Sequence, residues 1–329
     1  MPYYTLFSAT LFMGTLMCLS SNHWIYIWMG FEINLMSFIP LILHNNTNQE
    51  TEAAVKYFLA QALGSSLILL SSFSLLFHPF SSLPTSLALP TLVFAMMTKM
   101  GAAPFHFWLP QVMNSISWAS CMILATWQKI APLFILCSAS SVLSNKFVML
   151  TAMTGTLIGG LGGLNQTHLR PLLAYSSIGH LGWMIAATSI SLYATASYFS
   201  IYSLMTLAIM YTLHSHASKN NFISSMNSIS SLSAFSLMVL FLSLGGLPPL
   251  LGFFPKWLMI KFMIYQNMLT FLIIMIVGSL ISLFYYLSLF FNLFTNSILS
   301  SMKTKLGPSG PLNMSVIATT TLGLIPLIM

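Results

Sequence analysis

Apolar residues run along the whole chain in long stretches that short polar loops separate. A helix needs about 20 mostly apolar residues to cross about 30 Å of hydrocarbon. The pattern predicts eleven such helices, at residues 3–20, 24–43, 54–77, 86–106, 116–138, 145–163, 171–190, 194–214, 228–265, 268–294 and 312–329. The sequence therefore predicts an all-α polytopic membrane protein.

Runs that combine glycine and proline interrupt two of the predicted spans. Residues 101–104 (GAAP) interrupt the fourth span, and residues 245–249 (GGLPP) followed by Pro255 interrupt the ninth. The ninth is either one broken pass or two. If the ninth span is one broken pass, five Lys and Arg near loop ends lie on the N-terminal side of the membrane and two lie on the opposite side. If it is two passes, the numbers are four and three. One broken pass is favoured, which places the N-terminus on the inner side.

The two interrupted spans are five helices apart, an odd number of crossings. Helices one to five and six to ten would then be related by inversion, as in transporters built from inverted repeats with broken helices. We therefore expect one membrane domain over residues 1–329. Within it, residues 1–140 form the first inverted repeat, 141–295 the second, and 296–329 the last loop and helix.

Composition agrees with a membrane protein and excludes other classes. Hydrophobic residues make up 57% of the 329, and only 13 residues (10 Lys and Arg plus 3 Asp and Glu) carry a full charge. Soluble domains carry about 25% charged residues, so a soluble enzyme and a disordered chain are both excluded. The net charge of +7 is scattered in single residues, which disfavours nucleic acid as a partner. The three cysteines form no cluster, and no metal-binding or cofactor-binding motif is present.

Four charged side chains fall inside predicted spans: Glu32, Lys99, Lys129 and Lys256. A charge at the bilayer centre costs about 2.5 to 3.5 kcal/mol on the insertion scale. A buried ion pair that only fixes helix packing is the simpler interpretation of any one of them. One acid cannot neutralise three bases, however, so at least one Lys must be hydrated by internal water or release its proton. The set predicts a proton relay.

Two histidines are weaker candidates for the same relay. His106 follows Lys99 by seven residues, which is two turns and the same helix face if the helix continues through Pro104. His180 lies in the middle of the seventh span. An intramembrane His can transfer protons, but a single one is as often a polar packing residue.

Gly155, Gly159 and Gly163 recur at every fourth residue of the sixth span. This spacing gives a small-residue face that lets another helix approach closely. A glycine-rich nucleotide loop at residues 159–163 is the alternative, but no predicted strand precedes it. Close helix packing is favoured.

Four motifs resemble the NADH dehydrogenase subunit 2 family, the mitochondrially encoded chain of respiratory complex I in animals: KMGAAPFHFWLP at Lys99, ATWQKIAP at Lys129, SSIGHLGWM at His180 and LSLGGLPPLLGFFPKW at Lys256. The resemblance covers essentially the whole chain. It implies an antiporter-like subunit of the mitochondrial inner membrane with its N-terminus on the matrix side. Its implied partners are the other membrane-arm subunits, including neighbouring antiporter-like chains, and inner-membrane lipids.

The resemblance also implies a role for each matched position. Glu32 and Lys99 correspond to a buried ion pair, Lys129 to the central relay lysine, and Lys256 to the lysine that passes the proton onward. His106 and His180 would be secondary members that act through water. NADH, FMN, iron–sulfur clusters and ubiquinone would be bound elsewhere in the complex, with no cofactor in this chain.

Two alternatives to the complex I subunit remain. The same charges and helix breaks are compatible with a free-standing cation/proton antiporter. They are also compatible with a purely structural complex I subunit whose charges only hold helices together.

Overall fold

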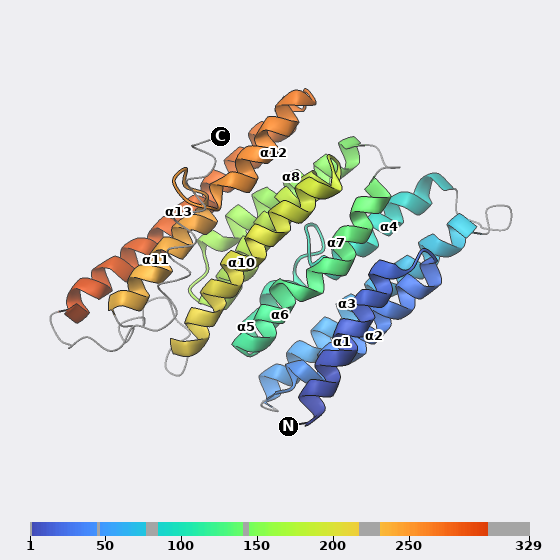
Figure 1. Cartoon of the computed structure of the whole chain (residues 1–329), viewed down its shortest axis with the longest axis horizontal. Coiled ribbons are helices and arrows are strands. Elements are labelled where there is room, and N and C mark those ends of the chain that lie inside the picture. Colours follow the sequence, from blue (N-terminus) through green and yellow to red (C-terminus); the bar gives the residue numbers. More distant parts are fainter. Residues whose placement is uncertain (1, 45–46, 77–84, 141–144, 217–230, 302–329) are drawn as a thin grey trace. The chain divides into compact units, whose positions relative to one another are not determined.

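The computed structural model describes residues 2–44, 47–76, 85–140, 145–216 and 231–301. In these residues the chain forms α-helices and no strand. Their bounds are α1 Pro2–Ser20, α2 Trp24–Ile42, α3 Asn48–Leu76, α4 Thr85–Met100, α5 Trp108–Ser115, α6 Trp118–Ala125, α7 Trp127–Ser140, α8 Asn145–Leu164, α9 Leu169–Thr188, α10 Leu192–His216, α11 Ser231–Gly245, α12 Phe253–Tyr265 and α13 Leu269–Ser301. Figure 1 shows these helices along the chain.

Ten of the eleven predicted spans overlap described helices, and the predicted last span, 312–329, lies outside the described residues. Among the residues that the structure describes, six segments are long and apolar enough to cross a membrane: Trp24–Ile42, Asn48–Leu75, Trp118–Ala139, Lys146–Leu164, Leu192–Ser215 and Leu269–Thr295. Three shorter apolar helices accompany them, at Tyr4–Ser20, Ala88–Met100 and Ser233–Gly245.

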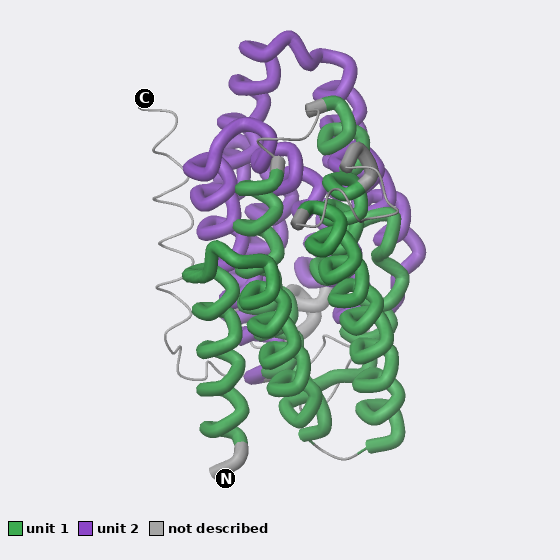
Figure 2. The backbone as a smooth tube through the Cα atoms, turned by 90° about the vertical axis from the view of Figure 1, so that its right-hand side faces the viewer, with its two compact units in different colours: residues 1–151 green, residues 152–329 purple. Residues whose placement is uncertain are grey.

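The helices separate into two compact units, residues 1–151 and 152–329 (Figure 2). The predicted boundary between inverted repeats lies nearby, at residues 140 and 141. The inverted relation between the halves stays a prediction.

In the first unit, α1 packs on α2, α2 on α3, and α3 on α4 and α5. The helices α1 and α2 approach closely at Gly14 and Gly30. A Cβ on Gly30 would lie 2.6 Å from Cys18 Sγ and 2.8 Å from the Gly14 carbonyl oxygen. Helix α4 also packs on α7, so the helix that carries Lys99 contacts the helix that carries Lys129.

In the second unit, α9 lies among α10, α12 and α13 and contacts all three. Seventeen of its 20 residues are buried, as expected for a helix that is apolar on every side. Two glycines of the α8 face, Gly155 and Gly159, pack on the same helix, and the third, Gly163, packs on Tyr285 of α13. A Cβ on Gly155 would lie 3.1 Å from Gly182 Cα, and one on Gly159 would clash with the backbone of Gly179. Close packing is confirmed, and the nucleotide-loop alternative is wrong because residues 159–163 are helical.

Both predicted helix breaks are present. Helix α4 ends at Met100 and is followed by Gly101 with φ of +69°, and α11 ends at Gly245 and is followed by Gly246 with φ of +81°. A positive φ is strained for residues with a Cβ, so glycine at these two points lets the chain turn out of the helix. The fourth span therefore stops short of the predicted residue 106, and the separate short helix α5 follows it.

A third break was not predicted. The expected continuous span 116–138 consists of α6 and α7, which are separated at Thr126. Thr126 has φ of −116° and ψ of −70°, and its hydroxyl donates to the Met122 carbonyl oxygen at 2.7 Å. A threonine hydroxyl that hydrogen-bonds to the carbonyl four residues earlier can bend a helix. No glycine or proline lies at this break to indicate it in the sequence. This break lies three residues before Lys129.

Candidate functional site

Lys99 lies in the last turn of α4, at the first helix break, and is 4% exposed. Its Nζ lies 4.5 Å from the centroid of the Phe31 ring on α2, a cation–π distance. Gln61 on α3 donates to the Lys99 carbonyl oxygen at 3.0 Å. Gly64, one turn further on α3, leaves room for the side chain, because a Cβ there would lie 2.8 Å from Lys99 Cγ. Both α2 and α3 thus fix the position of Lys99.

Glu32 neighbours Phe31 on α2 and interacts electrostatically with Lys99. The resemblance to the subunit 2 family led us to expect a buried ion pair between these two residues. The structure instead leaves Glu32 half-buried, and no ion pair within 4 Å joins it to Lys99 in the part of the chain that is described. The Lys99 ammonium lies over the neighbouring Phe31 ring instead.

Lys129 is almost completely buried, at 1% exposed, in the first turn of α7. Its backbone N–H donates to the Thr126 carbonyl oxygen at 3.2 Å, so Lys129 follows directly from the break between α6 and α7. The preceding residue, Gln128, donates through Nε2 to Asn34 Oδ1 on α2 at 2.7 Å. Like the other two candidate lysines, Lys129 therefore adjoins a helix break.

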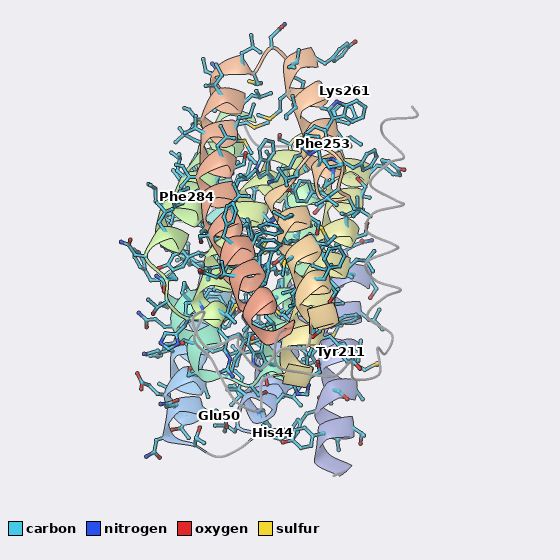
Figure 3. The ribbon with its side chains drawn as sticks, turned by 90° about the vertical axis from the view of Figure 1, so that its left-hand side faces the viewer. His44, Glu50, Tyr211, Phe253, Lys261 and Phe284 are labelled. Atoms are coloured by element: carbon cyan, nitrogen blue, oxygen red, sulfur yellow. The ribbon has the colours of Figure 1, made fainter. Side chains whose placement is uncertain are left out.

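Lys256 is 7% exposed in the first turn of α12, after the break that follows α11. Its Nζ donates to the Gly245 carbonyl oxygen, the last of α11, at 3.0 Å. A Cβ on Gly246 would lie 3.0 Å from the same Nζ. Lys261, at the other end of α12, is exposed, and its Nζ lies 3.5 Å from the centroid of the Trp257 ring (Figure 3). Only the first of these two lysines is directed into the protein.

His106 does not lie on the helix of Lys99. The prediction depended on a helix that continued through Pro104, and it is wrong because α4 ends at Met100. His106 lies in the turn before α5, where its Nδ1 is 3.1 Å from the Pro104 carbonyl oxygen and its ring lies against Phe107.

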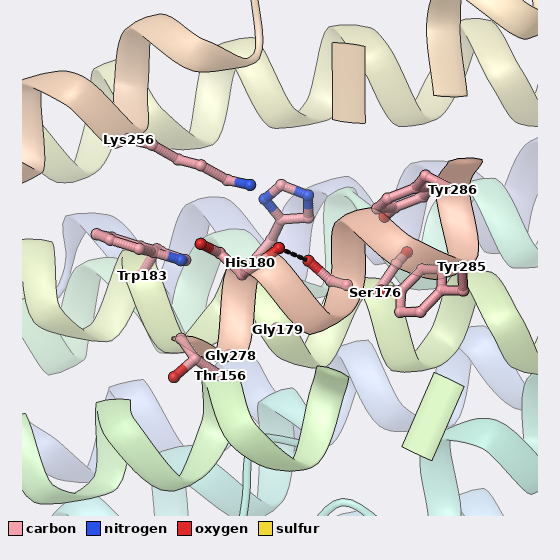
Figure 4. Close-up of a pocket in the computed structure, with 11 residues that line it drawn as sticks. Thr156, Ser176, Gly179, His180, Trp183, Lys256, Gly278, Tyr285 and Tyr286 are labelled. Carbon is pink, nitrogen blue, oxygen red and sulfur yellow. Dashed lines mark hydrogen bonds between the residues drawn. The ribbon is translucent and has the colours of Figure 1, made fainter. Parts of the chain in front are cut away.

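His180 is 5% exposed on α9, and its Nδ1 lies 3.1 Å from the Tyr198 hydroxyl of α10. The Tyr202 ring centroid is 5.2 Å from the imidazole centroid. Figure 4 shows the Lys256 ammonium directed toward the His180 ring. Within the second unit, the structure therefore brings together two predicted residues that are separated by 76 positions in sequence.

Four buried tyrosines surround this pair and escaped the sequence prediction: Tyr198, Tyr202, Tyr285 and Tyr286. The available signal was spacing, because the first two are four residues apart on one helix and the last two are adjacent in a long apolar helix. A tyrosine in an apolar helix is usually an ordinary packing residue, so the spacing alone did not distinguish them.

The predicted residues are divided between the two units. The first unit contains Glu32, Lys99, His106 and Lys129, and the second contains His180 and Lys256. Within the described ranges, no group of three or more His, Cys, Asp or Glu side chains is placed to hold a metal ion. The chemistry available to these residues is proton exchange between amines, imidazole, carboxylate and water.

Comparison with known proteins gives the same picture. Residues 21–282 match the family model described as NADH:quinone oxidoreductase/Mrp antiporter, transmembrane. The chain belongs to this family. It is therefore a multi-pass membrane protein with an antiporter-like fold.

Individual relatives narrow the position of the chain within the antiporter-like family. It is 44% identical over 305 residues to NADH-ubiquinone oxidoreductase chain 2 of Lumbricus terrestris, covering 92% of this chain and 87% of that one. It is 40% identical over 309 residues to NADH-ubiquinone oxidoreductase chain 2 of Locusta migratoria, covering 91% and 89%.

Solved structures share the fold of this antiporter-like chain. One chain of respiratory complex I from Thermus thermophilus with bound aureothin superposes with a TM-score of 0.82 at 25% identity, covering 99% of this chain and 79% of that one. A chain of the Mrp complex from Dietzia sp. DQ12-45-1b superposes with a TM-score of 0.80 at 14% identity, covering 97% and 74%. The second likeness is one of fold alone.

Proposed function

We propose that this chain is a core membrane subunit of mitochondrial NADH:ubiquinone oxidoreductase, and that it translocates protons across the inner membrane. The observation that carries the proposal is the placement of its three buried lysines. Lys99, Lys129 and Lys256 each adjoin a helix break and are at most 7% exposed. Charged groups and broken backbone are tolerated at membrane depth where they face protein or internal water, which are also the surroundings that a proton path requires.

Each buried group takes one step of the relay in this proposal. Glu32 acts on Lys99 electrostatically, so a change in the charge of one alters the proton affinity of the other. Lys129 is the central residue of the relay, and Lys256 and His180 transfer the proton further. In each step a protonated base donates to water or to the next base and becomes neutral, so protons are conserved and no cofactor is required. We propose this order because the resemblance to the subunit 2 family implies it.

His106 has a smaller role in the proposal. Its ring lies in the turn that follows the first helix break, where it can exchange protons with internal water. The electron-transfer groups of the enzyme, namely NADH, FMN, iron–sulfur clusters and ubiquinone, are bound by other subunits. The partners of this chain are the neighbouring antiporter-like subunits of the membrane arm and inner-membrane lipids, and its N-terminus lies in the matrix.

Membership of the complex is tested by blue-native separation of gently solubilised inner membranes, followed by mass spectrometry of the band that contains this chain. Comigration with flavin and iron–sulfur subunits at very high mass is the expected result. A small band that contains this chain alone and shows electroneutral cation/proton exchange would replace the proposal with a free-standing antiporter, a function that the Mrp-like fold also accommodates.

A purely structural role is distinguished by a lysine substitution. If the charges only hold helices together, Lys129→Ala lowers the yield of assembled complex and leaves the assembled fraction with normal proton translocation. The relay predicts the reverse, namely an assembled complex whose proton translocation is impaired.

A further inference from the structure

A small cavity with several polar side chains in its lining lies in the second unit, between α8, α9, α12 and α13. Its lining includes Ser176, His180, Lys256, Tyr285 and Tyr286 (Figure 4). The cavity has about 10 Å³ of space for the centres of water molecules. This volume is room for about one water, and a buried water needs two to four polar partners.

The two tyrosine hydroxyls on α13 have no hydrogen-bond partner among the described residues. Tyr285 and Tyr286 are 3% and 1% exposed, so bulk water does not reach them. The Tyr286 hydroxyl lies beside Ser176 and Tyr285, and the Tyr285 hydroxyl lies beside Ser282, but none of these neighbours has the geometry of a hydrogen bond to it. Buried hydroxyls in folded proteins nearly always have a partner, and two adjacent exceptions require an explanation.

Lys256 contributes further unused donors at the same place. Its ammonium has three N–H groups, and the described structure assigns one of them, to the Gly245 carbonyl oxygen at 3.0 Å. The ammonium is directed toward His180, and both residues line the cavity together with the two tyrosines (Figure 4). A water molecule here would accept from the ammonium and bond to a tyrosine hydroxyl.

We propose that Tyr285 and Tyr286 are positioning residues that hold an ordered water molecule between Lys256 and His180. The inference rests on the proposed proton relay and adds a step to it. The ammonium of Lys256 gives one proton to the water, and the water gives one of its own to His180, which becomes an imidazolium. The water is regenerated and Lys256 is left neutral. The hydroxyls orient the water throughout and are not consumed.

Two measurements on the assembled complex test this inference. The first is a high-resolution density map of the unmodified complex, in which we expect an ordered water within hydrogen-bond distance of Lys256 Nζ and a tyrosine hydroxyl. The absence of density for a water molecule between these groups would overturn the inference, whatever the behaviour of the variants.

The second measurement is proton translocation by reconstituted complexes that carry Tyr285→Phe, Tyr286→Phe or both. These substitutions keep the ring and remove only the hydroxyl. We expect the translocation rate of the double variant to fall about fivefold, which corresponds to the loss of about one hydrogen bond in the transfer step. The solvent deuterium isotope effect should increase, which a packing role would not produce. Tyr211→Phe is the matched control, because Tyr211 is 57% exposed on α10. The complex that carries this substitution should translocate protons normally.

A variant of the lysine itself separates the two proposals. If Lys256→Gln impairs translocation while the tyrosine variants behave like wild type, the tyrosine inference is wrong and the relay stands. If Lys256→Gln also translocates normally, the relay through this residue is wrong. If the double tyrosine variant does not assemble, the single variants and the density map still decide the question.

Discussion

The side-chain amide of Gln128 donates to Asn34 Oδ1 at 2.7 Å and so ties α7 to α2. Asn34 is 3% exposed, and it lies two residues after Glu32 on α2. Gln128 precedes Lys129, at the break between α6 and α7. The bond therefore holds together the two helices that carry the proposed relay acid, Glu32, and the proposed central lysine, Lys129.

Breaking this bond on one side should cost stability. Gln128→Leu leaves the Asn34 amide buried without its partner, and an unsatisfied buried amide destabilises by about 1 to 3 kcal/mol. We expect the assembled complex to dissociate at lower temperature, as measured by a thermal melt. The double variant Asn34→Leu with Gln128→Leu should lose less than the sum of the two single variants, because neither amide then remains unpaired.

Asn292→Leu is the control for this cycle, because Asn292 is exposed on α13. It should leave the melt unchanged. Strict additivity of the two single changes at Asn34 and Gln128 would show that the hydrogen bond does not couple the helices.

Glycine is required at position 246 for two independent reasons. Its φ is +81°, and a Cβ would lie 3.0 Å from Lys256 Nζ. Gly246→Ala should destabilise the chain by about 1 to 2 kcal/mol through the left-handed backbone alone. It should also displace the ammonium from the Gly245 carbonyl oxygen and slow proton translocation, as measured in proteoliposomes.

The neighbouring glycine offers a matched control. A Cβ on Gly245 would meet its nearest atom, Tyr286 Cδ2, at 3.6 Å, an ordinary contact distance, and the φ of Gly245 is not positive. Gly245→Ala should therefore assemble and translocate normally. Equal damage from both substitutions would argue against a special role for the Gly246–Lys256 contact.

Gly64 should also not tolerate substitution by a larger residue, because the Lys99 side chain packs against it. A Cβ there would lie 2.8 Å from both Lys99 Cγ and Thr98 Oγ1. Gly64→Ala should push the Lys99 side chain off the Phe31 ring and lower the translocation rate, and the loss of the cation–π contact alone costs about 0.5 to 2 kcal/mol. Ser66→Ala, on the exposed face of the same helix, is the control. Normal translocation by Gly64→Ala would show that the position of Lys99 is not critical.

The features that the sequence predicts well are those with a large local cost. Lys99, Lys129 and Lys256 stand out because each charge is expensive at membrane depth, and the breaks after Met100 and Gly245 follow from glycine and proline. The break at Thr126 has no such marker, since it depends on one hydroxyl that bonds back to Met122. His106 was misplaced because the end of α4 moved it to a separate turn.

Features that depend on long-range contact could not be predicted from one sequence. Asn34 and Gln128 are 94 residues apart, and nothing in either segment indicates the other. The cavity that Tyr286 and Lys256 line together could not be predicted either. In its own helix, Tyr286 looks like an ordinary packing residue and Lys256 like an isolated charge. Tertiary packing decides these contacts, and a single-helix pattern does not contain that information.

The central claim is that Lys129 transfers protons. The most direct test is the proton-to-electron stoichiometry of reconstituted complex that carries Lys129→Ala, measured together with its quinone reductase rate. Lys146→Ala is the control, because Lys146 is exposed at the start of α8. We predict that the Lys129 variant assembles and loses proton translocation, while the control matches wild type. An assembled Lys129→Ala complex with unchanged stoichiometry and unchanged reductase rate would contradict the relay.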